Sequence, residues 1–211
     1  MIIKAIIFDM DGVLIEAKDW HYEALNRALN LIGYEINRFD HLTRYDGLPT
    51  RKKLKMLTVE QGLPEGLHEF INEMKQLYTM EIVHAQCKPR FAQEYALSKL
   101  KSKGFKLGVA SNSIRATVEV IMRKSSLTGY LDVQLSNEDV TKPKPDPEMF
   151  TKAIEMLGLT PHDVLILEDN ENGIKAARAS GAHVMEVREV EEVNYENISS
   201  KLSQVEKGAN Q

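Results

Sequence analysis

Five short apolar segments constrain the fold of this chain more than any other feature of its sequence. They occupy residues 1–8, 105–110, 131–135, 164–167 and 183–187. The first is nearly continuous in isoleucine and other apolar residues, which is typical of a parallel strand buried on both faces. Helical patterns lie between the later segments, at 91–104, 118–122 and 150–158. Alternating strands and helices predict the α/β class, with a doubly wound parallel sheet covered by helices on both faces.

A long segment from residue 16 to residue 85 interrupts this alternation, because it has helical periodicity and no convincing strand. Its clearest pattern follows Pro64 and places apolar residues at 67, 70, 71, 74, 77 and 78, one face of a helix. We therefore predict an α-helical domain at 16–85, inserted into an α/β core made of residues 1–15 and 86–190. Residues 191–211 have only a weak helical pattern, so we expect a tail that is helical or partly disordered.

Polar residues that can bind phosphate or a metal ion follow several of the predicted strands. They are Asp9 and Asp11 after the first strand, Ser111, Asn112 and Ser113 after the second, Lys142 in a proline-rich segment, and Glu168 and Asp169 after the fourth. In an open parallel α/β sheet, ligands bind outside the carboxyl ends of the strands. We therefore expect these scattered residues to meet in one crevice.

Composition and charge exclude several classes of function. The 211 residues are 43% hydrophobic, which supports a buried core, and no apolar run approaches the roughly 20 residues that span a bilayer. The 27 Lys and Arg are interspersed with the 31 Asp and Glu, for a net charge of −4, and form no basic face for a nucleic acid. The single cysteine, Cys87, cannot form an internal disulfide, and the amino terminus lacks the pattern of a secretion signal. We expect a cytoplasmic protein with neither a nucleic-acid nor a membrane partner.

Four motifs, in order, resemble those of the haloacid dehalogenase superfamily. They are Asp9-Met10-Asp11-Gly12-Val13-Leu14, Ser111-Asn112-Ser113, Lys142-Pro143-Lys144-Pro145-Asp146-Pro147, and Glu168-Asp169-Asn170 followed by Gly173-Ile174. The resemblance covers about residues 1–188, and it is to the branch that contains β-phosphoglucomutase and phosphoglycolate phosphatase. It implies a Rossmann-like core, a cap inserted after the first strand, and a small phosphorylated metabolite as the partner. We expect a monomer or a weak homodimer.

The residue types at the first motif suit phosphoryl transfer from a stable monoester. Such a reaction needs an attacking group and an acid for the departing oxygen. We assign Asp9 as the nucleophile that forms an aspartyl-phosphate. Asp11, two residues later, would protonate the leaving alcohol and later deprotonate water, help that is typically worth ~10²–10⁴ in rate.

The carboxylates after the fourth strand predict a hard cation. Glu168 and Asp169 would repel Asp9, Asp11 and the phosphate unless a cation lay between them, and Mg²⁺ is the natural choice. By the resemblance, Asp9, Asp169 and the backbone carbonyl of Asp11 are its ligands. Glu168 is either a further ligand or a carboxylate just outside the ligand set.

The resemblance also implies the residues that hold the phosphate. Ser111 and the backbone of Asn112 would donate hydrogen bonds to it, and a lysine would lie against the phosphate and Asp9. The family pattern reads lysine, proline, any residue, proline, aspartate. Lys142, rather than Lys144, matches this pattern.

Residues of the predicted cap should contact the substrate. The segment 44–51 resembles the family's substrate-specificity loop, with Gly47 in the expected place and Arg51 one position away from an arginine of the mutase pattern. His21 aligns with a position at the hinge between core and cap, although a structural histidine is at least as good an interpretation. The mutase pattern has a lysine just before the glycine that corresponds to Gly47 and, three positions after it, an arginine that grips the substrate's second phosphate. This chain has Asp46 and Thr50 in these places.

Hydrolysis is therefore our preferred function: a Mg²⁺-dependent phosphatase acting on a small phosphorylated metabolite, most simply a sugar phosphate. Two alternatives stay open at this point. One is a phosphosugar mutase like β-phosphoglucomutase, and the other is a non-catalytic phosphate-binding module on the same fold.

Overall fold

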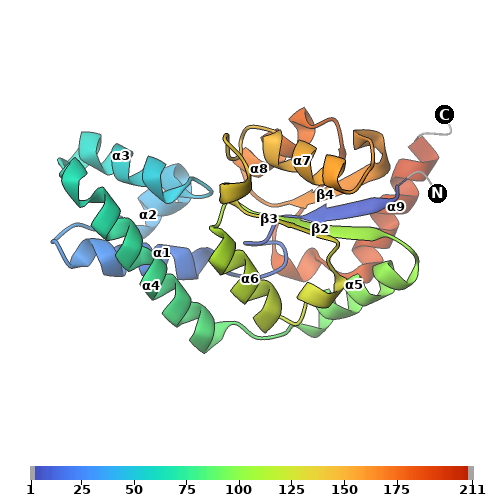
Figure 1. Cartoon of the computed structure of the whole chain (residues 1–211), viewed down its shortest axis with the longest axis horizontal. Helices are drawn as coiled ribbons and strands as arrows, with labels where there is room; N and C mark the ends of the chain where they lie inside the picture. Colours follow the sequence, from blue (N-terminus) through green and yellow to red (C-terminus); the bar gives the residue numbers. More distant parts are fainter. Residues whose placement is uncertain (1–2, 209–211) are drawn as a thin grey trace. The chain divides into compact units, whose positions relative to one another are not determined.

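The computed structural model describes residues 3–208, which contain a parallel five-stranded sheet in the order β3-β2-β1-β4-β5 (Figure 1). The strands are β1 (Ala5–Phe8), β2 (Lys106–Ala110), β3 (Val133–Leu135), β4 (Val164–Glu168) and β5 (His183–Glu186). All the ladders are parallel. This confirms the predicted α/β class, although residues 1 and 2 of the first predicted strand lie outside the described part.

Strand β1 lies at the centre of the sheet because every one of its side chains is apolar and buried. It pairs with β2 on one side and with β4 on the other. The ladder continues past the strand, where the Asp9 N–H donates to the Leu167 carbonyl at 2.9 Å. Asp9 is thereby fixed beside the end of β4, where Glu168 follows Leu167.

Helices cover both faces of this sheet, as the alternating pattern predicted. They are α5 (Phe91–Ser102), α6 (Arg115–Lys124), α7 (Glu148–Met156), α8 (Glu171–Ala179) and α9 (Tyr195–Gly208). Figure 1 shows α7 and α8 on one face and α5 and α6 on the other. Short 3-10 helices are formed by Thr128–Tyr130, Asn137–Asp139, Pro161–Asp163 and Val190–Glu192. One core cluster joins α7 and α8 to the sheet through buried residues such as Phe150, Ala153 and Ala176.

The carboxyl-terminal segment is helical over much of its described length. Helix α9 packs against α5 and buries Ile198. Residues 209–211 of the predicted tail lie outside the described part. Within this segment, the helix spans Tyr195–Gly208.

Contacts divide the chain into two compact units, one of which is the helical segment Ala17–Cys87. It contains α1 (Lys18–Asn30), α2 (Arg38–Asp40), the π-helical turn η1 (His41–Tyr45), α3 (Thr50–Gln61), a 3-10 turn (Glu65–Leu67) and α4 (His68–Gln86). Helix α3 ends at Gly62, whose φ of +73° is the left-handed conformation that glycine adopts readily. Helices α1 and α4 pack together over a core that includes Leu25, Leu29 and Ile71. The predicted cap, 16–85, falls almost wholly within this unit.

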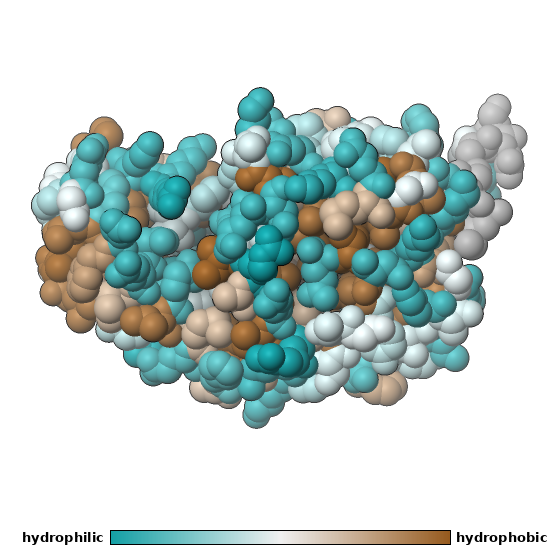
Figure 2. All heavy atoms as spheres, viewed as in Figure 1, coloured by the Kyte–Doolittle hydropathy of each residue, from teal (hydrophilic) through white to brown (hydrophobic). Residues whose placement is uncertain are grey.

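Apolar side chains also reach the surface of both units. Figure 2 shows them among a largely hydrophilic surface. The most exposed large ones are Leu31, Phe39, Leu42, Val59, Leu77, Phe91 and Met156. Across residues 3–208, no helix has the length and apolar character needed to cross a membrane.

Candidate active site

Three carboxylates meet at the ends of β1 and β4. Asp9, Glu168 and Asp169 each offer an oxygen atom, and these atoms lie within 4.8 Å of one another. Asp9 and Glu168 are buried, and Asp169 is half-buried. Adjacent parallel strands bring them together, as expected from their positions in the sequence. Oxygen donors alone suit a hard cation such as Mg²⁺.

Asp11 lies on the turn that follows β1. Gly12 has a φ of +86°, and its N–H donates to the Ile15 carbonyl at 2.7 Å, so the chain reverses directly after Asp11. The Oδ2 atom of Asp11 accepts a hydrogen bond from Ser113 Oγ at 3.3 Å. The turn and Ser113 therefore hold a fourth carboxylate, which is half-buried, close to the end of β2.

The lysine in contact with Asp9 is Lys144, which corrects the choice of Lys142 made from the sequence. Lys144 Nζ lies 2.6 Å from Asp9 Oδ1 and 2.6 Å from Glu168 Oε1, and it donates to the Ala110 carbonyl at 2.9 Å. Its side chain is only 3% exposed. Lys142 is exposed, and its backbone N–H donates to Glu148 Oε2 at 2.8 Å. Glu148 thus holds the loop at the surface around Lys142, and the chain turns inward afterwards.

The sequence contains two overlapping copies of the lysine motif, which explains the wrong choice. Residues 142–146 read lysine, proline, any residue, proline, aspartate, and residues 144–148 read the same with glutamate in the last place. The contacts of Phe150 favour the copy at residues 144–148. Phe150 lies in the first part of α7 and is apolar and buried. Its ring centroid lies 4.5 Å from Lys144 Nζ, within the range of a cation–π contact.

Both oxygen atoms of Glu168 already accept hydrogen bonds. Oε1 accepts from Lys144, and Oε2 accepts from the backbone N–H groups of Asp169 and Asn170 at 3.0 and 3.2 Å. The carboxylate lies against Gly173 of α8, where a Cβ atom would come within 1.8 Å of Oε1. Glu168 therefore orients Lys144 and the turn before α8, which favours the expectation of a carboxylate just outside the metal ligands.

The site carries an excess of negative charge. Burial raises the pKa of Asp9 well above its usual value; the Lys144 ammonium opposes this, while the charges of Glu168, Asp169 and Asp11 add to it. Burial alone would lower the pKa of Lys144, but Asp9 and Glu168 outweigh burial and raise it. Four carboxylates against one ammonium form an arrangement that a divalent cation would stabilise.

Ser111 and Asn112 follow β2, as the sequence predicted. Ser111 is buried; its N–H donates to the Leu135 carbonyl at 3.0 Å, and its Oγ accepts the Ser113 N–H at 3.0 Å. The side chain of Asn112 contacts the backbone of Lys144. Its Oδ1 accepts the Lys144 N–H at 3.2 Å, and its Nδ2 donates to the Lys144 carbonyl at 3.4 Å.

The three predicted cap residues belong to the helical unit. His21 Nδ1 lies 3.3 Å from Lys75 Nζ, Gly47 has a φ of +67°, and Arg51 is exposed in the first turn of α3. Their contact with a substrate stays a prediction. Sequence reasoning missed Lys75, which is buried in α4. The available signal was its spacing of four residues from Ile71, on the face that the apolar pattern turns inward.

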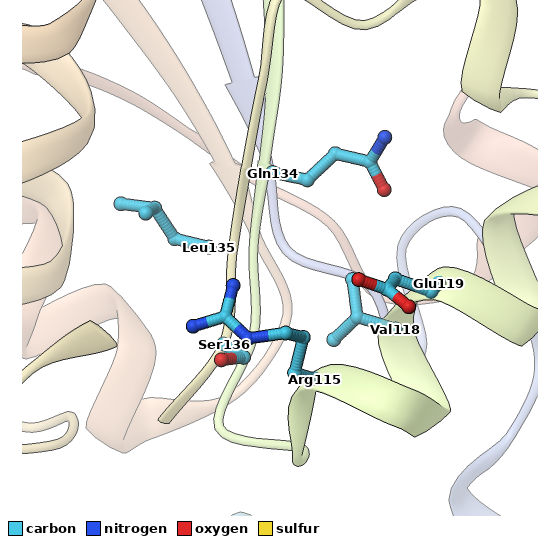
Figure 3. Close-up of a pocket in the computed structure, with 6 residues that line it drawn as sticks. All are labelled: Arg115, Val118, Glu119, Gln134, Leu135 and Ser136. Atoms are coloured by element: carbon cyan, nitrogen blue, oxygen red, sulfur yellow. The ribbon is translucent and has the colours of Figure 1, made fainter. Parts of the chain in front are cut away.

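A separate hollow lies beside α6 and β3 (Figure 3). It is lined by Arg115, Val118, Glu119, Gln134, Leu135 and Ser136. Within residues 3–208, the Oε1 atom of Gln134 is buried and has no hydrogen-bond partner. The lining includes neither Lys144 nor any of the four carboxylates at the strand ends, so the chemistry is assigned to the strand ends rather than to this hollow.

Comparisons with known proteins agree with this geometry. Residues 6–187 match the family model described as haloacid dehalogenase-like hydrolase. A phosphorylated carbohydrates phosphatase of Thermotoga maritima is 30% identical over 181 residues, which cover 84% of this chain and 82% of that protein. A phosphoglycolate phosphatase of Aquifex aeolicus is 32% identical over 178 residues, covering 84% and 81%.

A solved structure supports the fold independently. The β-phosphoglucomutase of Clostridium difficile superposes with a TM-score of 0.83 at 20% identity, covering 96% of this chain and 98% of that one. At this identity the similarity shows the fold alone.

Proposed function

The chain belongs to the haloacid dehalogenase-like hydrolase family and is an enzyme of the phosphatase type. We propose that it hydrolyses a small phosphorylated metabolite, most simply a sugar phosphate, and that it uses Mg²⁺. The observation that carries the proposal is the buried Asp9 carboxylate. Lys144 Nζ lies 2.6 Å from it, and the carboxylates of Glu168 and Asp169 lie beside it.

Asp9 and Asp11 have different roles in the proposed reaction. An oxygen of Asp9 attacks phosphorus while the bond from phosphorus to the alcohol oxygen breaks, and Asp11 gives that oxygen a proton. Asp11 then takes a proton from water, which attacks the aspartyl-phosphate and releases inorganic phosphate. The contact between Ser113 Oγ and Asp11 Oδ2 holds the acid in place, and proton transfer of this kind is typically worth ~10²–10⁴ in rate.

The phosphate dianion needs compensating positive charge beside Asp9. The Lys144 ammonium supplies part of it, since charge-assisted donors stabilise phosphoryl transfer most in a buried site. The buried Ser111 follows the same strand end and is our candidate donor to the phosphate. Asp9 and Asp169 would hold Mg²⁺ together with the Asp11 carbonyl, and Mg²⁺ would neutralise further charge there.

The relatives act on different phosphate esters, and they limit the class of substrate that we propose. Those at 30% and 32% identity are a phosphatase of phosphorylated carbohydrates and a phosphoglycolate phosphatase, so we prefer hydrolysis to a mutase reaction. Thr50 also lacks the cationic side chain that grips a second phosphate in the mutase pattern. We propose that His21, Gly47 and Arg51 contact the substrate.

The proposal extends to the state of the protein in the cell. We propose a cytoplasmic monomer or weak homodimer, without a nucleic-acid partner. The interspersed charges and the presence of a single cysteine, the buried Cys87, support it.

A screen of phosphorylated metabolites for phosphate release tests the function. We expect release from at least one small phosphate ester in Mg²⁺, none in EDTA, and none from the Asp9→Asn variant. The α- and β-glucose 1-phosphates belong in the screen, because conversion to a sugar phosphate without release of inorganic phosphate would indicate a mutase. Undiminished turnover in EDTA or in Asp9→Asn would contradict the proposed chemistry.

A further inference from the structure

The amide side chain of Asn112 binds both backbone groups of a single residue, Lys144. Oδ1 accepts its N–H at 3.2 Å and Nδ2 donates to its carbonyl at 3.4 Å. The two residues are 32 positions apart, and both contacts are partly buried. An asparagine that pairs with a backbone in both directions fixes the position and the orientation of that backbone, as a neighbouring strand would.

Asn112 is itself held on two sides. Its carbonyl accepts a hydrogen bond from Asn137 Nδ2 at 2.9 Å, and Asn137 N–H donates to the Ser113 carbonyl at 3.0 Å. Directly before it in the chain, Ser111 N–H pairs with the Leu135 carbonyl of β3. The side chain of Asn112 therefore extends from the rigid end of the sheet.

Residues at the end of β2 contact both the backbone and the side-chain nitrogen of Lys144. Asn112 holds the backbone, and the Ala110 carbonyl accepts from Nζ at 2.9 Å. Between these anchors the side chain reaches Asp9 and Glu168 with contacts of 2.6 Å. The other anchor of this loop, Glu148, binds the backbone N–H groups of Thr141 and Lys142 at its exposed start.

From this geometry we propose that Asn112 is a positioning residue, which sets the backbone of Lys144 so that its ammonium stays against the nucleophile Asp9. This rests on the proposed function, and it gives the side chain of Asn112 a role in addition to the one expected of its backbone at the phosphate. The side chain acts through Lys144, because both of its hydrogen bonds go to the backbone of that residue. Its loss should therefore reduce kcat and leave KM nearly unchanged.

The experiment compares Asn112→Ala with a matched variant from the other unit. In the helical unit, Asn26 makes the same two-way contact with the backbone of Ile36, with both distances 2.8 Å. Asn26→Ala thus removes an equivalent pair of hydrogen bonds without touching Lys144. Asn112→Asp keeps the acceptor for the Lys144 N–H and serves as the conservative variant.

Two readouts are needed, and one does not depend on activity. The first is kcat and KM for the best substrate of the screen. The second is the rate at which an amine-acylating reagent labels Lys144, followed by mass spectrometry of its peptide. Labelling of a buried amine requires local opening, so Asn112→Ala should accelerate it roughly tenfold, and Asn26→Ala should not.

We expect kcat of Asn112→Ala to fall about 10- to 100-fold, the cost of a small misplacement in an active site, and Asn112→Asp to recover part of the loss. Unchanged labelling of Lys144 in Asn112→Ala would overturn the proposal, as would a raised KM with normal kcat. If Asn112→Ala does not fold, Asn112→Asp decides by the same two readouts. If the wild-type protein releases no phosphate, the proposed function fails while labelling still tests the contact.

Discussion

At the scale of single residues, the ammonium of Lys144 should decide activity. Replacement by methionine, Lys144→Met, removes a buried charge-assisted donor, a change that costs about 10²–10³ in kcat in comparable sites. It also leaves Asp9 and Glu168 buried without their cation, which typically destabilises a fold by about 3–5 kcal/mol. Phosphate release and urea unfolding measure the two effects.

The matched control for this variant is Lys142→Met. Lys142 is exposed, and its contact with Glu148 uses the backbone, so its loss should change stability by less than about 0.5 kcal/mol and leave kcat near the wild-type value. An inactive Lys142→Met beside an active Lys144→Met would show that the lysine was assigned wrongly.

A second prediction at this scale concerns Gly173. A Cβ atom there would meet Glu168 Oε1 at 1.8 Å, so Gly173→Ala must displace the carboxylate that holds Lys144. Overpacking of this kind typically costs about 1–3 kcal/mol, although alanine in a helix normally stabilises it. Urea unfolding measures the change. Gly66→Ala is the control because nothing lies within 4 Å of its added Cβ, and equal stability of the two variants would contradict the prediction.

At the scale of elements, the turn η1 predicts that the free energy of unfolding depends on pH. His41 is 2% exposed, and its ring centroid lies 4.6 Å from that of Tyr22 with the two rings tilted to one another. In the described chain neither of its ring nitrogens has a hydrogen-bond partner. Burial first, and then the charge of Lys53, lower the pKa of His41 to about 4, although the charge of Asp46 opposes them. An unfolded histidine has a pKa of about 6.5.

Since the folded pKa lies below the unfolded one, the unfolded chain binds more protons between these values, and the free energy of unfolding falls as the pH is lowered through the interval. At about 1.36 kcal/mol per pKa unit, His41 should contribute a loss of about 2 kcal/mol between pH 7 and pH 5. His41→Phe should remove this part of the slope in urea unfolding, whereas the exposed His84→Phe should keep it. Identical slopes in wild type and His41→Phe would contradict the assignment.

The sequence predicted some elements of the structure and not others. The strands and the residues at their ends were predictable, because apolar runs define parallel strands and the sheet brings their ends together. That is how Asp9 and Glu168 were found. The loop that carries Lys144 was not, because its path depends on contacts with Asn112 and Glu148, and the motif repeats with an offset of two residues. Helical periodicity predicted α4 but gave no role to the buried Lys75.

At the scale of the whole molecule, the acidic site links metal binding to stability. The chain is acidic by only four charges, yet the described site concentrates Asp9, Asp11, Glu168 and Asp169 around one lysine. A cation that binds the folded state and not the unfolded chain stabilises the fold by RT ln(1 + [L]/Kd), about 2.7 kcal/mol at a concentration of 100 Kd. Saturating Mg²⁺ should therefore raise the thermal unfolding midpoint in the absence of any substrate.

The Asp169→Asn variant should lose this rise, because it removes a carboxylate of the cluster and retains the shape of the side chain. Asp132→Asn, an exposed carboxylate that accepts from Lys101, should keep it. Thermal unfolding with and without Mg²⁺, together with calorimetric titration of Mg²⁺ into each variant, measures both. A rise of the same size in Asp169→Asn would place the cation elsewhere, and no rise in the wild type would remove the metal from the proposed function, because a carboxylate cluster that gains nothing from Mg²⁺ has no need of it.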